Sequence, residues 1–147
     1  MSILVDSGVL LRLTIPADPA YPEVRRAIKL LKSQGENLIA LTQNVAEFWN
    51  VCTRPSTARG GYGISVQDTV RKLRLIEKLV EIKPDSLRVF QEWKRLAVLH
   101  SVKGVQVHNA RLVAAMIVYG ISNLLTFNGA DFKRYSGINV VRPVDIQ

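Results

Sequence analysis

The chain has 147 residues, of which 48% are hydrophobic and 22% are charged; this composition is typical of a globular domain and excludes a disordered chain. No apolar run is long enough to cross a bilayer, and the N-terminal stretch MSILVDSG has no basic segment ahead of a long apolar one, so we expect a cytoplasmic protein with no signal peptide and no membrane partner. The net charge of +8 favours a polyanionic partner, although basic charge can also serve solubility alone.

The N-terminal part of the chain alternates apolar runs with segments of helical spacing. In chain order, we predict a strand over Ser2–Val5, a proline-rich break over Pro16–Pro22, a helix over Glu23–Ser33, a strand over Asn37–Thr42, a helix over Gln43–Thr53 with Thr42 as its N-cap, and a loop over Arg54–Gly63. The single cysteine, Cys52, excludes an internal disulfide and suits a reducing cytoplasm, and we expect it to pack among apolar neighbours.

The C-terminal part continues the alternation. We predict a helix capped by Ser65 and running to Val80, a helix from Pro84-Asp85 to His100, a helix over Asn109–Tyr119 ended by Gly120, and strands over Asn123–Phe127 and Ile138–Pro143. Strands that alternate with helices predict one α/β domain over residues 1–147, with a mainly parallel sheet covered on both faces. Ligands of such sheets bind at the carboxyl ends of the strands, beside a topological switch point.

Two acidic residues lie in apolar surroundings that call for an explanation. Asp6 directly follows the first strand, where it can simply cap the next helix. Glu47 lies in the stretch NVAEFWNV inside a predicted helix, and a buried unpaired carboxylate there would be costly. A salt bridge to Arg12 or Arg54 is the ordinary solution, and coordination of a cation is the alternative.

A third polar group follows the predicted strand Asn123–Phe127. Thr126, Asn128 and Asp131 lie at and just past its carboxyl end, where a turn with a self-capping Asp is the local explanation. Because Asp6, Glu47 and Asp131 all follow strand ends, their oxygens can converge from distant segments. Hard cations such as Mg²⁺ and Mn²⁺ prefer oxygen ligands, and a site of this kind can activate water against a phosphodiester.

Four stretches together resemble the PIN domain, and most closely the VapC-type toxins of bacterial type II toxin–antitoxin modules. The stretches are ILVDSGVLLR, TQNVAEFWNVCTRP, GVQVHNARLVAAM and LLTFNGADFKRY…INVVRP, and the resemblance runs from Ile3 to Pro143. No single stretch is very specific, but the four in this order are. The first stretch departs slightly, with Ser7-Gly8 where Thr-Asn is frequent in the family.

The resemblance implies an α/β/α ribonuclease fold with a site for Mg²⁺ or Mn²⁺. By position, Asp6 corresponds to the first acid of the family, Glu47 to the second and Asp131 to the fourth, with Thr126 and Asn128 lining the same pocket. The resemblance also implies three partners: an RNA substrate, a second copy of the chain and a cognate antitoxin.

The third acidic position holds Asn109, where the family usually has Asp. Asn109 can cap its helix, so it costs the fold little, but it brings no negative charge and is a poorer metal ligand. We therefore predict a well-folded chain that binds metal weakly and cuts RNA slowly or not at all. Asn109 is either natural or a substitution of the usual Asp, and the intact surrounding pattern favours the substitution.

Several neighbouring residues have secondary expectations. For His108 we favour a structural hydrogen bond over a role as general base. Arg111 can pair with a nearby acid or contact a phosphate, and Lys133 and Arg134 are candidate phosphate contacts that can equally be solvated. Two rival functions remain: a non-catalytic PIN-fold module that binds RNA or protein, for which Asn109 is native, and a nuclease that acts on DNA.

Overall fold

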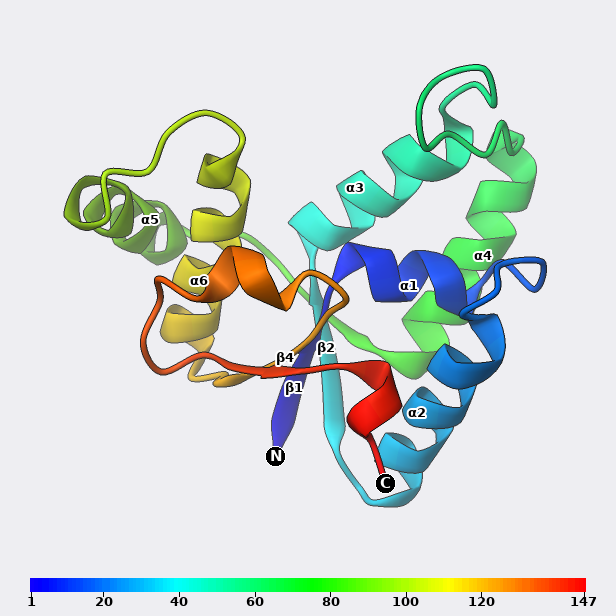
Figure 1. Ribbon diagram of the computed structural model, residues 1–147, viewed down its shortest axis with the longest axis horizontal. Coiled ribbons are helices and arrows are strands. Elements are labelled where there is room, and N and C mark those ends of the chain that lie inside the picture. Colours follow the sequence, from blue (N-terminus) through cyan, green and yellow to red (C-terminus); the bar gives the residue numbers. More distant parts are fainter.

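The computed structural model describes residues 1–147 and contains one five-stranded sheet in which every neighbouring pair of strands is parallel (Figure 1). The strands are β1 (Ser2–Val5), β2 (Asn37–Leu41), β3 (Glu81–Lys83), β4 (Asn123–Leu125) and β5 (Asn139–Val141). The helices are α1 (Ser7–Leu13), α2 (Tyr21–Ser33), α3 (Thr42–Thr53), α4 (Val66–Leu79), α5 (Leu87–Leu99) and α6 (Gln106–Tyr119), with short 3-10 helices η1 (Gly129–Phe132) and η2 (Pro143–Asp145).

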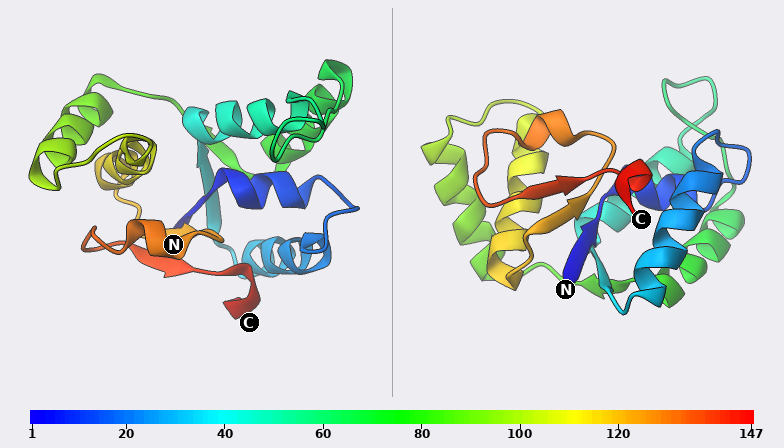
Figure 2. Two further views of the ribbon diagram at one scale, coloured as in Figure 1. Left: turned by 45° about the horizontal axis from the view of Figure 1, so that its top comes forward. Right: turned by 60° about the horizontal axis from the view of Figure 1, so that its bottom comes forward.

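The sheet is apolar on both faces, which is why its strands read as continuous apolar runs. Successive residues of a strand point to opposite faces, so Ile3 and Val5 join one core cluster with α1, α2, α3 and α4, while Leu4 joins the other with α5 and α6. The views in Figures 1 and 2 show α5 and α6 on one side of the sheet and α1, α2 and α4 on the other. The predicted α/β fold with two covered faces is therefore confirmed.

The strand order is β3-β2-β1-β4-β5, so the chain builds outward from β1 in both directions. The order reverses between β1 and β4, whose carboxyl ends lie side by side. There the backbone N–H of Asp6 donates to the carbonyl of Leu125 at 3.0 Å, which continues the β1–β4 pairing past the end of β1. This is the switch point at which open parallel sheets place their ligands.

The sequence pattern misses one strand. We predicted four strands, but Glu81–Lys83 forms the additional edge strand β3 in the stretch predicted as the connection between two helices. This strand has only three residues and one apolar side chain, Ile82, because an edge strand needs no continuous apolar run.

Several predicted boundaries shift by one to three residues. Leu41, not Thr42, is the N-cap of α3, and its backbone N–H donates to the Asn44 side chain at 2.9 Å. The α2 helix begins at Tyr21, since Pro22 fits the first turn of a helix where no N–H is needed. The α5 helix begins at Leu87, after the side chain of Ser86 caps it by accepting from the N–H of Val89.

Cys52 is fully buried in the core cluster on the α1 side, as expected. Burial raises the pKa of its thiol to about 11, against a smaller opposing effect of the nearby Lys72 charge. The thiol is therefore protonated at neutral pH and packs as a small apolar side chain.

None of the helices combines the length and the apolar character that crossing a membrane requires.

Candidate active site

Asp6 both caps a helix and lies at the sheet edge where a site was expected. Its Oδ1 accepts from the backbone N–H of Ser7 at 2.8 Å, which caps α1, and its Oδ2 accepts from the Thr126 hydroxyl at 2.7 Å. Only 9% of Asp6 is exposed. The hydrogen bond to Thr126 joins the carboxyl ends of β1 and β4, so the side chain is fixed from both strands at the switch point.

Glu47 lies beside Asp6 and its two oxygens are held by different elements. The Ser7 hydroxyl donates to Glu47 Oε2 at 2.9 Å and also lies 3.4 Å from Asp6 Oδ1. The Gln43 side-chain N–H donates to Glu47 Oε1 at 3.0 Å from one turn earlier on α3. Ser7 therefore stands between Asp6 and Glu47, which we call the carboxylate pair.

No cationic side chain neutralises the carboxylate pair. The salt bridges of the chain all involve other acids. The salt bridge considered for Glu47 is absent, because Arg12 instead donates to the carbonyl of Gly8 and faces Asp18, while Arg54 donates to the carbonyl of Arg59. The hydrogen-bond donors that surround the pair are therefore all neutral.

The electrostatics of Asp6 reflect this arrangement. Burial raises the pKa of Asp6 above its ordinary value, and the negative charge of Glu47 adds to the rise, while the hydrogen bonds from Thr126 and Ser7 oppose it. A cation bound beside the two carboxylates would favour their charged forms and so oppose this rise.

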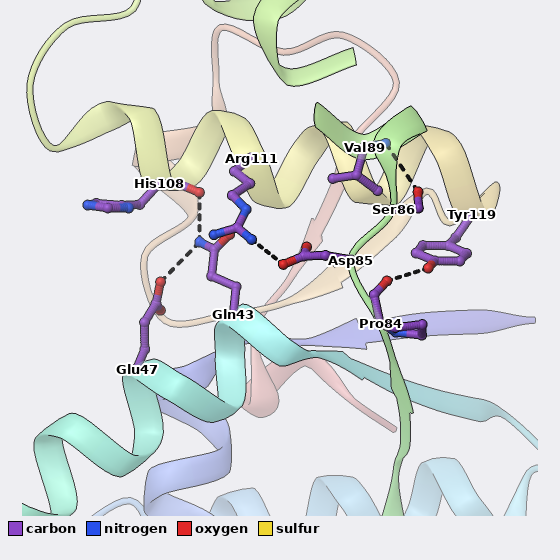
Figure 3. A network of polar contacts seen from close by, with 9 residues as sticks. All are labelled: Gln43, Glu47, Pro84, Asp85, Ser86, Val89, His108, Arg111 and Tyr119. Carbon is purple, nitrogen blue, oxygen red and sulfur yellow. Dashed lines mark hydrogen bonds and ion pairs between the residues drawn. The ribbon is translucent and has the colours of Figure 1, made fainter. Parts of the chain in front are cut away.

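Gln43 connects the carboxylate pair to the start of α6. Its side-chain N–H₂ donates both to Glu47 and, at 2.9 Å, to the backbone carbonyl of His108, as Figure 3 shows. Both partners are acceptors, so the amide nitrogen must face them. Gln43 is buried, and its own oxygen has no hydrogen-bond partner.

Asn109 does not cap α6, contrary to the expectation. The helix begins at Gln106, and a turn over Lys103–Val105, with Gly104 at φ 57°, brings the chain into helical geometry three residues before Asn109. The Asn109 side chain is partly exposed, and it makes no hydrogen bond in the structure. The structural hydrogen bond predicted for the His108 side chain is absent, since that side chain is exposed and makes none; only the His108 backbone carbonyl takes part, accepting from the Gln43 side chain.

Asp131, at the fourth acidic position of the family pattern, does not join the carboxylate pair. Asp131 lies in η1 with its side chain exposed, and no group of three acidic, histidine or cysteine side chains lies close enough together to hold a metal ion. Of its two predicted pocket partners, Thr126 binds Asp6 directly. Asn128 contributes a backbone N–H to the Thr126 hydroxyl at 3.0 Å, and its side chain is exposed.

The basic residues expected to contact phosphate have different surroundings. Arg111 forms an ion pair with Asp85, which lies in the connection between β3 and α5 (Figure 3). Arg134 donates to the Gln106 side chain at 2.8 Å and to the carbonyl of His100 at 3.3 Å. Lys133 is exposed and makes no hydrogen bond.

Glu47 of the carboxylate pair lines a polar cavity between α3 and α6. Its volume is about 480 Å³, and Gln43, Glu47, Asn50, His108 and Arg111 supply its polar lining. We call it the polar cavity. A ligand that enters it meets Glu47 directly.

The donor set of the pair fits a small divalent cation. Proteins commonly bind Mg²⁺ through one or two carboxylates, and the remaining positions are taken by water and substrate phosphate. Asp6 and Glu47 supply two carboxylates with no competing cation, and Ser7 holds one oxygen of Glu47 toward Asp6. With Asn109 at the third position, the pair would have to hold the ion without a third carboxylate.

No family model and no curated protein matches this chain. Solved structures do match over nearly the whole chain. A chain of VapBC2 from Rickettsia felis, crystallised with a DNA fragment from its promoter, has a TM-score of 0.74 at 14% identity, covering 97% of this chain and 98% of that chain. The Mycobacterium tuberculosis VapC20, a toxin that cleaves the sarcin–ricin loop, has a TM-score of 0.66 at 18% identity, with coverage of 90% and 94%.

A third match is a chain of a toxin–antitoxin complex from Klebsiella pneumoniae, with a TM-score of 0.65 at 17% identity, covering 96% of this chain and 97% of that chain. The five-stranded parallel sheet and its two helical layers correspond to those of these proteins. The chain therefore has the VapC-type PIN fold, as the sequence motifs predicted.

Proposed function

We propose that this chain, with its VapC-type PIN fold, is an endoribonuclease that hydrolyses RNA phosphodiester bonds and whose activity is attenuated by Asn109. The observation that carries the proposal is the carboxylate pair itself. Two acids from different elements meet at the switch point of the sheet, held by neutral donors and free of any salt bridge. A structural role in stability alone would be better served by a neutralised or apolar pair.

Asp6 and Glu47 would hold the metal ion, Mg²⁺ or Mn²⁺. When bound, such an ion supplies Lewis-acid stabilisation of the charge that develops on the phosphate, and it makes water more acidic. Thr126 and the Ser7 N–H fix the two oxygens of Asp6, while Ser7 and Gln43 fix those of Glu47. These contacts keep the two carboxylates oriented before substrate arrives, so little reorganisation is needed during the reaction.

Asn109 is the proposed cause of attenuation. It follows His108 in the first turn of α6. Gln43 donates both to the His108 carbonyl and to Glu47, so this turn is hydrogen-bonded to the candidate site. An Asp at this position would add a third negative charge to the region, whereas the Asn amide adds none. We expect weaker cation binding than in an otherwise identical chain with Asp.

The proposed partners follow from the structural neighbours and from the charge. VapC20 cleaves the sarcin–ricin loop and the Klebsiella pneumoniae neighbour is part of a toxin–antitoxin complex, which supports an RNA substrate and a cognate antitoxin for a chain of the same fold. The net charge of +8 suits a polyanionic substrate. A second copy of the chain is also proposed as a partner, in keeping with the sequence resemblance.

One observation favours a second candidate function, that of a non-catalytic binding module. The structure contains no group of three potential metal ligands, and the third acidic position is Asn109. Such a module would bind RNA with a strong dependence on salt and no dependence on Mg²⁺ or Mn²⁺.

The test is RNA cleavage by three chains: the chain itself, Asn109→Asp, and Asn109→Asp combined with Glu47→Gln. Transfer RNA and ribosomal RNA fragments are offered with Mn²⁺, Mg²⁺ or a chelator, alongside DNA of matching sequence. The proposal expects Asn109→Asp to cut RNA only with metal, and Glu47→Gln to abolish the cutting. If Asn109→Asp cuts none of these RNAs, the nuclease proposal fails and the binding module takes its place; cutting of DNA alone would assign a DNA nuclease.

A further inference from the structure

A second cavity, of about 350 Å³, lies between α5 and α6 and differs in character from the polar cavity. Its apolar wall consists of Val89, Phe90, Trp93 and Val107, and its charged edge is the Asp85–Arg111 ion pair. We call it the aromatic cavity. We propose that it is the subsite for an unpaired nucleobase of the RNA whose phosphodiester lies at the carboxylate pair; the assignment of that phosphodiester rests on the nuclease function proposed above.

The two aromatic rings are presented in a way that suits a planar ligand. Phe90 is 51% exposed although it is a large apolar side chain, and its ring centroid lies 6.2 Å from that of Trp93, with the planes inclined at 32°. The Trp93 indole N–H donates to the carbonyl of Val107 at 2.9 Å, which fixes the ring and satisfies its one polar atom. Unpaired bases stack on exposed aromatic rings of this kind.

The charged edge adds hydrogen-bonding groups of both kinds. Asp85 offers a carboxylate acceptor and Arg111 a guanidinium donor, joined to each other across the cavity edge. The edge of a nucleobase carries both donors and acceptors, and the guanidinium plane is itself a stacking surface for bases. A purely apolar ligand would leave this edge without new partners.

The aromatic cavity and the polar cavity share two lining residues, His108 and Arg111. In Figure 3, Arg111 extends from α6 between Glu47 on one side and Asp85 on the other. Asp85 follows the carboxyl end of β3, so the aromatic cavity lies on the same edge of the parallel sheet as Asp6. A single strand of RNA could therefore place its phosphate at the carboxylate pair and a neighbouring base on Phe90 and Trp93.

Phe90→Ala tests the subsite with two probes: a fluorescently labelled single-stranded RNA decamer of mixed sequence, and a decamer with the same ribose-phosphate backbone but no bases. Loss of one base–aromatic stack should weaken binding of the first decamer by roughly five- to 150-fold and leave binding of the second unchanged. Phe90→Tyr keeps the ring and should keep the affinity. Val98→Ala is the matched control, since Val98 is 78% exposed on the same helix outside the aromatic cavity.

The subsite is overturned if Phe90→Ala weakens both decamers equally, or matches Val98→Ala. It is also overturned if Phe90→Ala leaves RNA binding intact but converts a dimer to a monomer or releases an antitoxin peptide, because the aromatic cavity would then be a protein interface. Binding is read without cleavage, so the two proposals fail separately. If Asn109→Asp cuts RNA with the same KM with and without Phe90→Ala, the subsite proposal fails and the nuclease proposal stands. If RNA binding depends on the bases but no RNA is cut, the subsite proposal stands and the nuclease proposal fails.

Discussion

Asp6 and Asp85 occupy comparable places in the fold, but their surroundings are opposite. Each lies just past the carboxyl end of a parallel strand, β1 for Asp6 and β3 for Asp85. Asp85 is half-exposed and paired with the guanidinium of Arg111. Asp6 is buried, accepts only from neutral N–H and O–H groups, and lies beside the second carboxylate of Glu47.

The difference shows that the hydrogen-bond and ion-pair partners of an acid at this sheet edge decide whether it can serve as a metal ligand. A carboxylate that is already paired with an arginine attracts a metal cation less, so its role is in structure or recognition. An acid held by neutral donors has a fixed geometry and no bound cation that would compete with a metal ion. The surface pair Arg142–Asp145 repeats the first case, since the hydrogen bond from Arg142 lowers the pKa of Asp145, whereas burial raises that of Asp6.

The largest expected effect comes from removing the charge of Asp6. Asp6→Asn in the Asn109→Asp chain should lower Mn²⁺ affinity and RNA cleavage by about 100-fold or more, exceeding what loss of an outer partner of a ligand costs. Because Asn is also a good N-cap, α1 should remain intact, which circular dichroism can check. Cleavage within a few-fold of that of the parent would remove Asp6 from the site.

A smaller loss is expected at Gln43. Gln43→Leu removes the hydrogen bonds to Glu47 and to the His108 carbonyl, so it should weaken Mn²⁺ binding and cleavage by roughly 10- to 100-fold. Gln91→Leu, at an exposed position on α5, is the control and should have no effect. Equal results for the two variants would show that Gln43 does not position Glu47.

The raised pKa of Asp6 predicts a pH dependence of stability in metal-free buffer. A carboxyl whose pKa is higher in the folded state than in the unfolded state destabilises the fold above that folded pKa, and this contribution disappears below the unfolded value near 3.8. In urea unfolding with a chelator, Asp6→Asn should therefore gain free energy of unfolding over the parent as pH rises through the folded pKa. A gain that is the same at acidic and neutral pH would contradict the assignment.

The smallest effect is expected at Asp85, the acid that is paired with Arg111. Asp85→Asn breaks an exposed ion pair, so the free energy of unfolding should change by less than about 1 kcal/mol, and the change should shrink in high salt. Thermal unfolding at low and high salt measures both. A large loss that is independent of salt would mean that Asp85 holds α5 and α6 together.

The fold was largely predictable because its strands are buried on both faces. Continuous apolar runs such as Ile3–Val5 and helical spacing in α2 leave little ambiguity about the element type. The edge strand β3 was not predictable, since its half-exposed residues carry no apolar pattern and its existence depends on pairing with β2. The start of α6 was set by the turn at Gly104, and the polar side chain of Asn109 gave a misleading cap.

The candidate site was predictable only in part. Asp6, Glu47 and Thr126 could be predicted because each follows a strand end in an apolar context. Ser7 and Gln43 could not, since their roles depend on hydrogen bonds to other elements that only the packing of α1, α3 and α6 creates. The spacing of four residues between Gln43 and Glu47 was the one available signal, and it is too common on helix surfaces to be specific.

The most direct test of the central claim is calorimetric titration of Mn²⁺ into the chain, Asn109→Asp and Glu47→Gln. If the carboxylate pair is a cation site, the chain should bind one ion weakly, Asn109→Asp should bind it more tightly, and Glu47→Gln should not bind it. Equal heats for the chain and for Glu47→Gln, or no binding by Asn109→Asp, would contradict the claim that Asp6 and Glu47 form a cation site.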